Sequence, residues 1–340
     1  MKKLFFASMA LCAGLLFVSC SEDENGGPSP SDPVSGASVT NKSDLATKAG
    51  LLVKQIGDYS FGYDNKNRVV SVRYKDYGFE ESITLDYEKG LLYWGEEPYT
   101  VKFNKDGYIT EIAFTWEENY GKNEMEKVTY SQTFVYDTNG HMISSKCKEI
   151  YTEIYDGETY TESFDATYSL TWENGNLLKA VCDFNEIEDD EYYNEKSNSQ
   201  VSYSTKSNQY LQMLAQIDEV IDMDIDGVLY ATGLFGKGAK NLPSSVISTF
   251  VEYEDGDVYS SEEHIKFEFT QNSNNTIASE KVCYLDEDGD IDYDRDAVSY
   301  TYIPTSSVER MQQSSVYSTP NDTRAAKPIG KLLRRHSRRR

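Results

Sequence analysis

Apolar and polar residues alternate along most of the chain, from about residue 51 to residue 303. In the clearest stretch, every second position holds an apolar side chain: Phe164, Ala166, Tyr168, Leu170 and Trp172. A period of two residues is the spacing of a β-strand with one buried face. The same alternation recurs at 128–136 and at 265–269. The pattern therefore predicts an almost continuous series of strands.

A turn pattern separates these strands. An aromatic residue is followed by a short polar turn with Gly or Asn and then by aliphatic residues, at 63–70, 87–92, 103–109, 136–143 and 172–178. Asn and Gly adopt positive φ at little cost, which tight hairpins need. Consecutive hairpins predict a large antiparallel meander, and closing it into a barrel-like sheet would remove its exposed edges.

One stretch has a different period. Apolar residues recur at spacings of three and four between residues 210 and 221. This spacing is typical of an amphipathic helix. The predicted fold class is therefore all-β, a curled antiparallel meander with one inserted α-helix.

The beginning of the chain predicts export and lipidation. A short basic start precedes an apolar run at residues 4–18, which is too short to span a membrane and is typical of a secretory signal. Residues 17–20 resemble the bacterial lipobox, although Phe17 replaces the usual Leu. The prediction is a lipoprotein signal peptide at 1–19 and acylation of Cys20. An ordinary signal peptide cleaved nearby is the alternative.

Two segments without strand periodicity flank the β domain, which is predicted to cover residues 47–305. Residues 20–46 are acidic and rich in Ser, Pro and Gly, as expected for a tether. Three acids follow Cys20 almost directly, at residues 22–24, and resemble the export signal of Bacteroidota surface lipoproteins; a merely polar tether is the alternative. Residues 306–340 are predicted to be a disordered tail with a basic end. The predicted location is the outer membrane, lipid-anchored and exposed at the cell surface.

The charge balance restricts the partners. The chain has 57 Asp and Glu against 33 Lys and Arg. The basic residues after Thr323 leave the rest of the chain still more acidic. Such a body repels nucleic acid and anionic membrane surfaces. We therefore expect a monomer that contacts the membrane only through its lipid and does not bind nucleic acid.

The stretch from residue 233 to residue 243 reads Gly-Leu-Phe-Gly-Lys-Gly-Ala-Lys-Asn-Leu-Pro. Together with the Tyr-Asp-x-x-Gly-like hairpins, it resembles a family of Bacteroidota lipoproteins of unknown function, over about residues 50–305. The resemblance implies a porin-like fold and no known activity, although the chain lacks the lipid-facing apolar girdle of a membrane barrel. The hairpins alone also resemble the longer, more regular tyrosine–aspartate repeats of secreted shell proteins.

The same glycine-rich stretch lacks the spacing of a phosphate-binding loop. Its glycines are better explained by a close crossing of two backbones, with Leu234 and Phe235 filling the core.

Cation-binding and redox signals are incomplete. Asp222, Asp224 and Asp226 match the first half of a calcium loop, but Gly233 stands where a bidentate Glu is expected. We therefore expect no cofactor, with calcium the only candidate. No C-x-x-C pair occurs, which argues against zinc and thioredoxin-type chemistry. Cys147, Cys182 and Cys283 are expected to be buried thiols, although the sequence also permits one disulfide among them.

No catalytic residue is predicted. The histidines have no partner at nucleophile or metal spacing, and no G-x-S-x-G or H-E-x-x-H occurs. Acidic pairs such as 117–118 and 262–263 are interpreted as solvated loop charges. A glycosidase needs only two placed carboxylates, however. A carboxylate-dependent hydrolase acting on a surface polysaccharide is therefore the alternative hypothesis.

Aromatic residues near turns and charged loops are the candidates for ligand stacking, because Tyr and Trp offer a face and a polar group together. They are Trp94, Trp116, Tyr192 and Tyr193. The leading hypothesis is a binding or structural module that contacts a glycan or another envelope component.

Overall fold

The computed structural model describes residues 50–76, 79–121, 124–188, 191–209, 220, 227–254 and 257–305. Most of these residues lie in strands: β1 (Leu51–Ile56), β2 (Tyr59–Tyr63), β3 (Val69–Asp76), β4 (Phe79–Asp86), β5 (Leu91–Trp94), β6 (Glu97–Phe103), β7 (Ile109–Gly121), β8 (Glu124–Tyr136), β9 (Met142–Tyr155), β10 (Glu158–Glu173), β11 (Asn176–Glu188), β12 (Glu191–Ser207), β13 (Asn241–Glu254), β14 (Asp257–Gln271), β15 (Ile277–Leu285), β16 (Ile291–Asp294) and β17 (Val298–Pro304). A short helix, α2 (Gly227–Tyr230), precedes β13.

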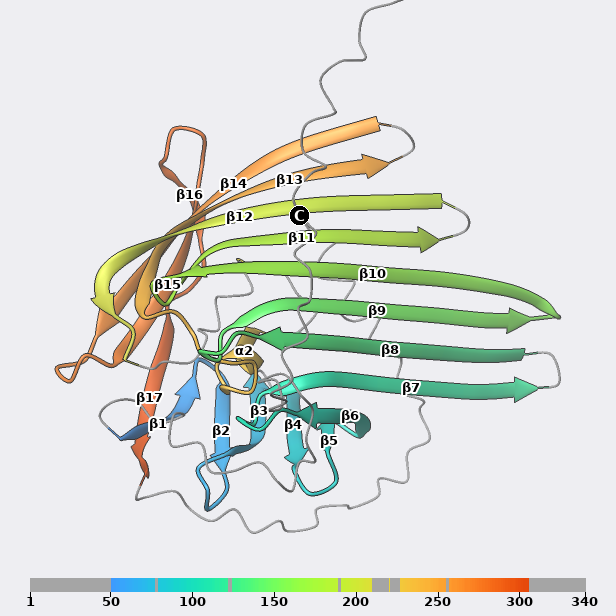
Figure 1. Cartoon of the computed structure of the whole chain (residues 1–340), viewed down its shortest axis with the longest axis horizontal. Coiled ribbons are helices and arrows are strands. Elements are labelled where there is room, and N and C mark those ends of the chain that lie inside the picture. The colour runs from blue at the N-terminus through green and yellow to red at the C-terminus, as the bar shows by residue number, and fades with distance from the viewer. Residues whose placement is uncertain are drawn as a thin grey trace, which may run out of the picture.

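The strands close into an antiparallel barrel. Each strand from β1 to β15 pairs with the next along the chain, and β17 pairs with both β15 and β1. The closed barrel has 16 strands, and β16 is an extra strand paired with β15. The predicted all-β, barrel-like fold is therefore confirmed. Strands β7–β14 form a broad wall that extends beyond the short strands β1–β6 (Figure 1).

The predicted helix at 210–221 lies outside the described residues apart from Val220, which is helical and buried. Among the described residues, no helix is long and apolar enough to cross a membrane.

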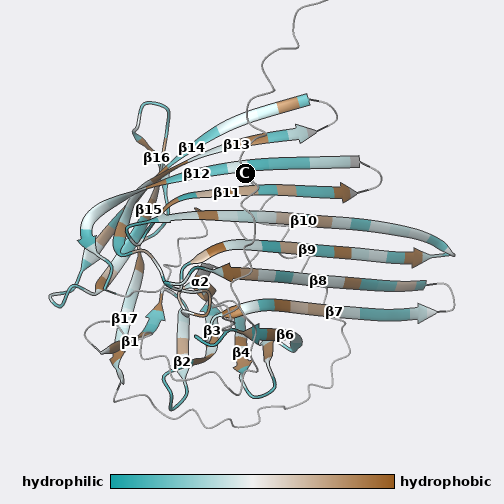
Figure 2. Ribbon diagram, viewed as in Figure 1, coloured by the Kyte–Doolittle hydropathy of each residue, from teal (hydrophilic) through white to brown (hydrophobic). Residues whose placement is uncertain are grey.

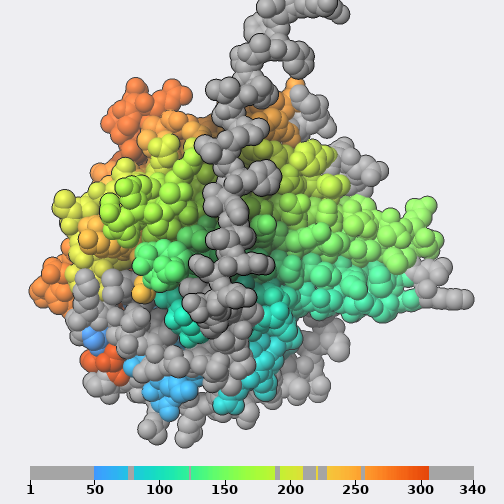
Figure 3. Space-filling view, in the orientation of Figure 1, coloured from blue at the N-terminus to red at the C-terminus, as the bar shows by residue number. Residues whose placement is uncertain are grey.

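The alternating pattern fills the barrel from one face of each strand. In β10, Phe164, Ala166, Tyr168 and Leu170 are at most 7% exposed, whereas the residues between them face solvent. Hydrophobic and hydrophilic residues alternate in the same way along the other long strands (Figure 2). In the space-filling view the ends of β7–β10, coloured green, project beyond the rest of the molecule (Figure 3). The long strands are therefore packed at one end and extend past the core at the other.

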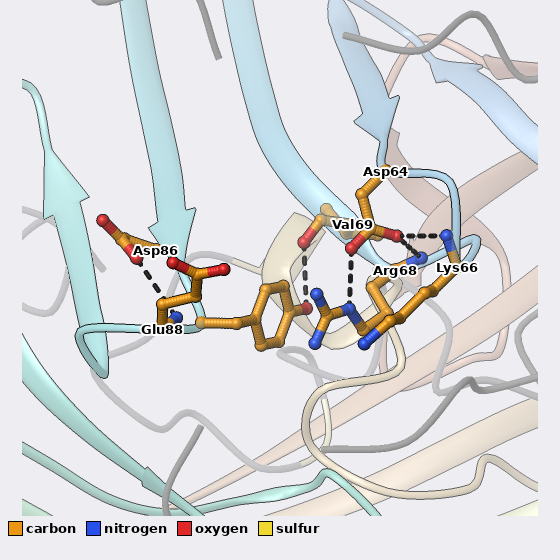
Figure 4. A network of polar contacts seen from close by, with 7 residues as sticks. Asp64, Lys66, Arg68, Val69, Asp86 and Glu88 are labelled. Carbon is orange, nitrogen blue, oxygen red and sulfur yellow. Dashed lines mark hydrogen bonds and ion pairs between the residues drawn. The ribbon is translucent and has the colours of Figure 1, made fainter. Parts of the chain in front are cut away.

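The five predicted hairpins all lie at the same end of the barrel, because each joins an even-numbered strand to the next odd-numbered one. The β2–β3 turn is representative. Asp64 accepts hydrogen bonds from the backbone N–H groups of Lys66 and Arg68, both at 2.9 Å, and from Nε of Arg68 at 2.7 Å (Figure 4). The Arg68 guanidinium lies 4.1 Å from the centre of the Tyr87 ring, in cation–π contact. We call the end of the barrel that carries these five hairpins the turn end.

At this end, an aromatic residue at or near the end of a strand binds a neighbouring strand. Its polar atom donates a hydrogen bond to a backbone carbonyl at or near the start of a neighbouring strand. The pairs, which we call aromatic latches, are Tyr63 with Val53 (2.6 Å), Tyr87 with Val69 (2.9 Å), Tyr136 with Ile109 (2.6 Å), Trp172 with Met142 (2.7 Å), Tyr203 with Leu177 (2.9 Å) and Tyr302 with Ile277 (2.9 Å). Since buried carbonyls need a donor, these hydrogen bonds account for the Tyr or Trp that precedes four of the five predicted turns; Phe103, before the β6–β7 turn, is the exception.

Residues 228–242, the plug segment, fill the barrel at the turn end. Its largest buried side chains include Tyr230, Phe235 and Leu242, and the Phe235 ring packs edge-on against Phe134 of β8 at 5.1 Å. These contacts confirm the expected core-filling role of this stretch.

The plug segment also binds three successive hairpins through its backbone. The carbonyl of Leu234 accepts from the N–H of Ile109 (2.8 Å), Lys237 N–H donates to Gly140 (2.8 Å) and Lys240 N–H donates to Gly175 (2.7 Å). A Cβ on Gly236 would lie 2.7 Å from the Gly140 carbonyl oxygen, so only glycine fits there. The close backbone crossing expected from the glycines is confirmed, and it joins the plug segment to the hairpins of the turn end.

Candidate functional site

The opposite end of the barrel, the open end, is formed by the far halves of the long strands β7–β14. On β8, the inner face carries Val128, Tyr130 and Phe134, and Glu126 continues the same series toward the open end. The other long strands follow this rule, with apolar residues inside near the plug and acids further out. These inward-facing acids form what we call the acidic inner wall: Glu118, Glu126, Glu149, Glu153, Glu162, Glu186, Glu195, Glu252 and Glu263.

Aromatic side chains alternate with these acids on the same face. Tyrosine hydroxyls donate to the carboxylate two residues along the strand, in Tyr120–Glu118 (3.0 Å), Tyr151–Glu153 (3.3 Å), Tyr160–Glu162 (2.7 Å) and Tyr193–Glu195 (3.0 Å). Residues two apart on a strand share a face, so these bonds lie along the wall. Burial and then the charges of Glu126 and Glu153 raise the pKa of the Tyr151 hydroxyl.

The strand register places some of these acids opposite one another. Glu126 of β8 is paired with Glu118 of β7 on one side and with Glu153 of β9 on the other, and Glu195 of β12 is paired with Glu252 of β13. Like charges directly opposite each other destabilise a sheet. A local arrangement that opposes folding is typical of a functional site.

The two faces of the wall differ in charge. At the described inner positions of β7–β14 there is no Lys or Arg, whereas the outer face carries Lys127, Lys146, Lys148, Lys179, Lys196 and Lys266. Outer acids pair with these lysines: Glu117 with Lys127 at 3.6 Å and Asp183 with Lys196 at 3.5 Å. The outer face therefore carries both positively and negatively charged side chains, whereas the charged side chains of the inner face are all negative.

The acids extend inward to a smaller group around Tyr99 of β6. Burial, followed by the charges of Glu97 and Glu149, raises the pKa of the Tyr99 hydroxyl. Burial also raises the pKa of the Glu97 carboxyl, whose Oε2 is buried without a hydrogen-bond partner in the described part of the chain. Glu149 and Glu162 are only 7% and 8% exposed. Glu97 lies two residues from Tyr99 on the same face of β6, and the charges of both Glu97 and Glu149 act on the Tyr99 hydroxyl.

The predicted stacking residues take different places. Trp116 and Tyr193 lie on the inner face and are partly buried; Trp116 packs against the core next to inward-facing Glu118, and Tyr193 lies beside Glu195. Trp94 packs against the core, is paired with Glu97 across β5 and β6, and donates its indole N–H to Glu81. Tyr192 lies on the outer face, 56% exposed, and donates to Asn185 at 2.6 Å. Three of the four aromatics are thus associated with inward-facing acids or the core.

The histidines in the described residues lie away from the wall. His141 is at the turn end, stacked on Trp172 at 4.4 Å and 3.2 Å from a carboxylate oxygen of Asp137. His264 is on the outer face of β14, 2.6 Å from Glu262. Within the described ranges, no group of three or more His, Cys, Asp or Glu residues has the geometry to hold a metal ion.

Several predicted features lie outside the described residues: the signal peptide, Cys20, the tether, the tail, and Asp222, Asp224 and Asp226 of the incomplete calcium loop. Of the cysteines, Cys147 and Cys283 are buried and Cys182 is partly buried, in agreement with their expected packing role.

The acidic inner wall is the feature that the sequence interpretation missed. The pairs 117–118 and 262–263, interpreted as loop charges, lie within β7 and β14, and one acid of each pair faces inward. The signal was present as an aromatic residue followed two positions later by Glu, as in Tyr151 and Glu153. Where acids replace apolar residues on the inner face of an alternating strand, that part of the strand extends beyond the hydrophobic core.

Comparison with models of known protein families gives no match, and neither does comparison with curated proteins. Among solved structures, the chain is similar to a porin-like protein from Bacteroides uniformis ATCC 8492, with 16% identity and a TM-score of 0.45, over 72% of this chain and 89% of that one. It is also similar to a porin-like protein from Bacteroides vulgatus ATCC 8482, with 14% identity and a TM-score of 0.45, over 74% of this chain and 98% of that one.

Proposed function

We propose that this protein is a lipid-anchored, surface-exposed lipoprotein of the bacterial outer membrane whose barrel binds a glycan or another envelope component at the acidic inner wall. The lipobox-like residues 17–20 and the acids behind Cys20 support the anchor and its location. The glycine-rich stretch at 233–243 and the hairpins support membership of the Bacteroidota lipoprotein family with a porin-like fold. The protein acts as a monomer, without a cofactor and without nucleic acid.

The observation that carries the binding role is the alternation of aromatic rings and carboxylates on the inner face of β7–β12. Aromatic rings such as that of Trp116 stack on the C–H face of a sugar, and carboxylates such as Glu126 accept hydrogen bonds from its hydroxyls. Because these positions hold no Lys or Arg, an anionic glycan is repelled. The ligand class that fits is therefore a neutral or amine-bearing glycan.

A glycan array probed with the purified protein tests this role. We expect binding to neutral or amine-bearing glycans that is reduced at least tenfold by Trp116→Ala combined with Glu126→Gln. The matched control, Tyr192→Phe combined with Glu117→Gln, changes an aromatic and an acid on the outer faces of the same wall and should bind as wild type. Binding restricted to anionic glycans, or equal loss in both variants, would contradict the proposal.

The group around Tyr99 favours a second candidate function, a carboxylate-dependent hydrolase. A glycosidase needs one carboxyl with a raised pKa that acts as an acid and a second carboxyl that is ionised. Burial raises the pKa of Glu97, while the charge of Glu149 acts on the hydroxyl of Tyr99, which shares the inner face of β6 with Glu97. Hydrolysis of a polysaccharide on which the protein binds, abolished by Glu97→Gln and by Glu149→Gln without loss of binding, would establish this activity. Retained hydrolysis in both variants would exclude these residues as the catalytic pair.

The anchor has its own test. Changing Cys20 to Ala removes the acylation site, so the protein should move from the detergent phase to the aqueous phase on Triton partitioning. If the Cys20→Ala protein stays in the detergent phase, the proposed anchor is wrong.

A further inference from the structure

We infer that one margin of the long wall, residues 258–262 of β14, binds an extended, positively charged peptide segment of a partner protein as an additional antiparallel strand. We call these residues the β14 edge. The β14 edge is separate from the proposed glycan site, because it offers backbone groups at the margin of the wall rather than side chains on its inner face.

The β14 edge has a paired strand on one side and none on the other, in the part of the chain that the structure describes. Strand β13 pairs with β14 from Asp257 to Lys266. On the other side, β15 pairs with β14 only from His264 onward, because β15 ends at Leu285, the partner of His264. Figure 1 shows β14 at the margin of the wall, with β15 beside only one end of it. All residues of the β14 edge are exposed, and Val258 has 60% of its surface exposed.

Three residues of the β14 edge direct their backbone polar groups away from β13. Antiparallel residues that stand opposite each other alternate between a pair that exchanges two hydrogen bonds and a pair that exchanges none. Glu254 and Asp257 are partners separated by two residues, as in a tight hairpin whose closing pair is hydrogen-bonded. Odd-numbered residues of β14 therefore bind β13, and Val258, Ser260 and Glu262 present their N–H and C=O groups on the opposite side.

The β14–β15 turn gives the same assignment. There the Asn272 N–H donates to the Thr276 carbonyl at 2.8 Å, so the even-numbered residues of β14 point toward β15. Beyond the end of β15, residues 258, 260 and 262 therefore present three N–H and three C=O groups to solvent. Backbone groups arranged in this way are a template for a further strand.

The other margin of the wall is less suited to adding a strand. Strand β7 pairs with β6 only as far as Ala113, but its register with β8 shifts between Asn119 and Gly121. A bulge of this kind twists an edge and protects it from pairing. The register of β13 with β14 has no shift, and residues 257–263 contain no Pro or Lys. The β14 edge is therefore the more regular of the two margins.

The acids around the β14 edge indicate a basic occupant. Residues 257–263 include Asp257, Glu262 and Glu263 and no Lys or Arg, and the neighbouring strand carries Glu252 on the same inner face as Glu263. An added strand places its side chains next to these acids, so alternate Lys or Arg residues form ion pairs there, whereas acids are repelled. A second copy of this chain does not meet this requirement, because pairing two β14 edges about Ser260 sets Asp257 opposite Glu263 of the other copy.

The antiparallel geometry determines which residues of the partner bind. Hydrogen-bonded residues in such a pair stand opposite each other and share a face of the sheet. Val258, Ser260 and Glu262 lie on the outer face of β14. The partner residues that bond to them therefore face outward, and the residues between face inward, next to Tyr259 and Glu263. The segment that fits alternates outward β-branched residues with inward Lys or Arg.

A synthetic peptide, Lys-Val-Lys-Val-Lys-Val-Lys, tests the strand addition with the full chain from residue 21 onward. Two N-methylated forms are the matched pair, one methylated on the three valine backbone nitrogens and the other on three lysine backbone nitrogens. In fluorescence anisotropy, valine methylation should weaken binding by about tenfold or more, because it removes the N–H groups that face β14. Lysine methylation should change the affinity by less than about twofold, since those N–H groups face solvent. Equal effects, or a greater loss on lysine methylation, would refute strand addition.

Two protein variants and hydrogen exchange locate the added strand. Ser260→Pro removes an N–H that points away from β13, so it should weaken binding of the unmethylated peptide by about tenfold or more, whereas Ser260→Ala should bind as wild type. In the wild-type protein, the peptide should slow amide exchange at residues 258, 260 and 262 and leave residues 114–121 of β7 unchanged, a readout that does not depend on the folding of Ser260→Pro. Slowing at β7 instead would overturn the inference. Slowing at β14 without peptide, increasing with protein concentration, would also overturn it and would identify a second copy as the occupant.

Discussion

The turn end and the open end of the barrel are built from the same strands with the same alternation, yet their inner faces differ completely. At the turn end, aromatic latches bind carbonyls and the plug segment hydrogen-bonds to Ile109, Gly140 and Gly175. At the open end, Glu126 stands opposite Glu118 and Glu153. The first arrangement stabilises the fold, whereas the second opposes it. The difference indicates that the stabilising contacts are concentrated at the turn end, and it leaves the open end as the proposed binding surface.

The largest expected effect is a loss of stability when a glycine at the turn end, rather than one at the open end, is replaced by alanine. Gly236 in the plug segment has φ +99°, and a Cβ there would lie 2.7 Å from a backbone oxygen. Gly157, in the β9–β10 turn at the open end, has φ +85° and nothing within 4 Å of such a Cβ. Gly236→Ala should therefore reduce the free energy of unfolding by about 3 kcal/mol or more, against about 1 kcal/mol for Gly157→Ala. Urea unfolding measures both, and equal losses would show that the turn end is not tightly packed.

A latch should contribute more than an exposed tyrosine. The Tyr136 hydroxyl is buried and donates to the Ile109 carbonyl at 2.6 Å, so Tyr136→Phe leaves a buried acceptor without its donor and should cost about 1–3 kcal/mol. Tyr192→Phe removes an exposed hydrogen bond to Asn185 and should change stability by less than about 0.5 kcal/mol. Similar melting temperatures for the two variants would show that the aromatic latches do not stabilise the turn end.

The turn end should also respond to acid through Asp137. Burial acts to raise its pKa, but the N–H and ring of His141 and the Asn139 side chain bind the carboxylate, and the pKa lies below its ordinary value of 3.8. Since the folded-state pKa is below the unfolded one, the stabilisation is present at neutral pH and is lost as the pH falls through the folded-state pKa. Asp137→Ala should cost about 1 kcal/mol at pH 7 and less at about pH 3. Asp288→Ala, in the exposed β15–β16 turn, is the control; a pH-independent cost at position 137 would refute this role.

The smallest effect is expected at Glu97, where the core meets the acids. Burial raises its pKa above the ordinary value of 4.5, so its charged form opposes folding as the pH rises through the folded-state pKa. Glu97→Gln should therefore raise the melting temperature slightly at pH 7, with the gain disappearing near pH 4, where the carboxyl is protonated. Exposed Glu96→Gln should show no such gain. A variant less stable than wild type at pH 7 would mean that the Glu97 charge is stabilised locally.

The sequence predicted the local parts of this fold well. The hairpins, including the turn at 136–143, and the core-filling role of Leu234 and Phe235 are confirmed because each depends on neighbouring residues and simple backbone chemistry. Closure was expected only in general terms. It depends on the pairing of β1 with β17, which are separated by most of the chain, and no local pattern specifies such a partner.

The candidate site was harder to predict. The charged surroundings of Trp116 and Tyr193 predict that they contact a ligand, and both lie on the inner face. Alternation predicts which residues share a face of a strand. It does not predict how far along the strand the hydrophobic core extends, so the inward-facing acids could not be recognised. Glu118 and Glu263 belong to strands whose ends pass beyond the core, which becomes clear only when β7–β14 are placed side by side.

Ligand binding by three proteins tests most directly the central claim that the open end binds and the turn end stabilises. The proteins are wild type, the inner variant with Glu126→Gln, Glu153→Gln and Glu195→Gln, and the outer variant with Glu117→Gln, Asp165→Asn and Glu262→Gln. On one glycan array, the inner variant should lose at least tenfold in binding while its melting temperature is unchanged or higher, and the outer variant should bind as wild type. If the inner variant binds as tightly as wild type, the acidic inner wall is not the binding surface.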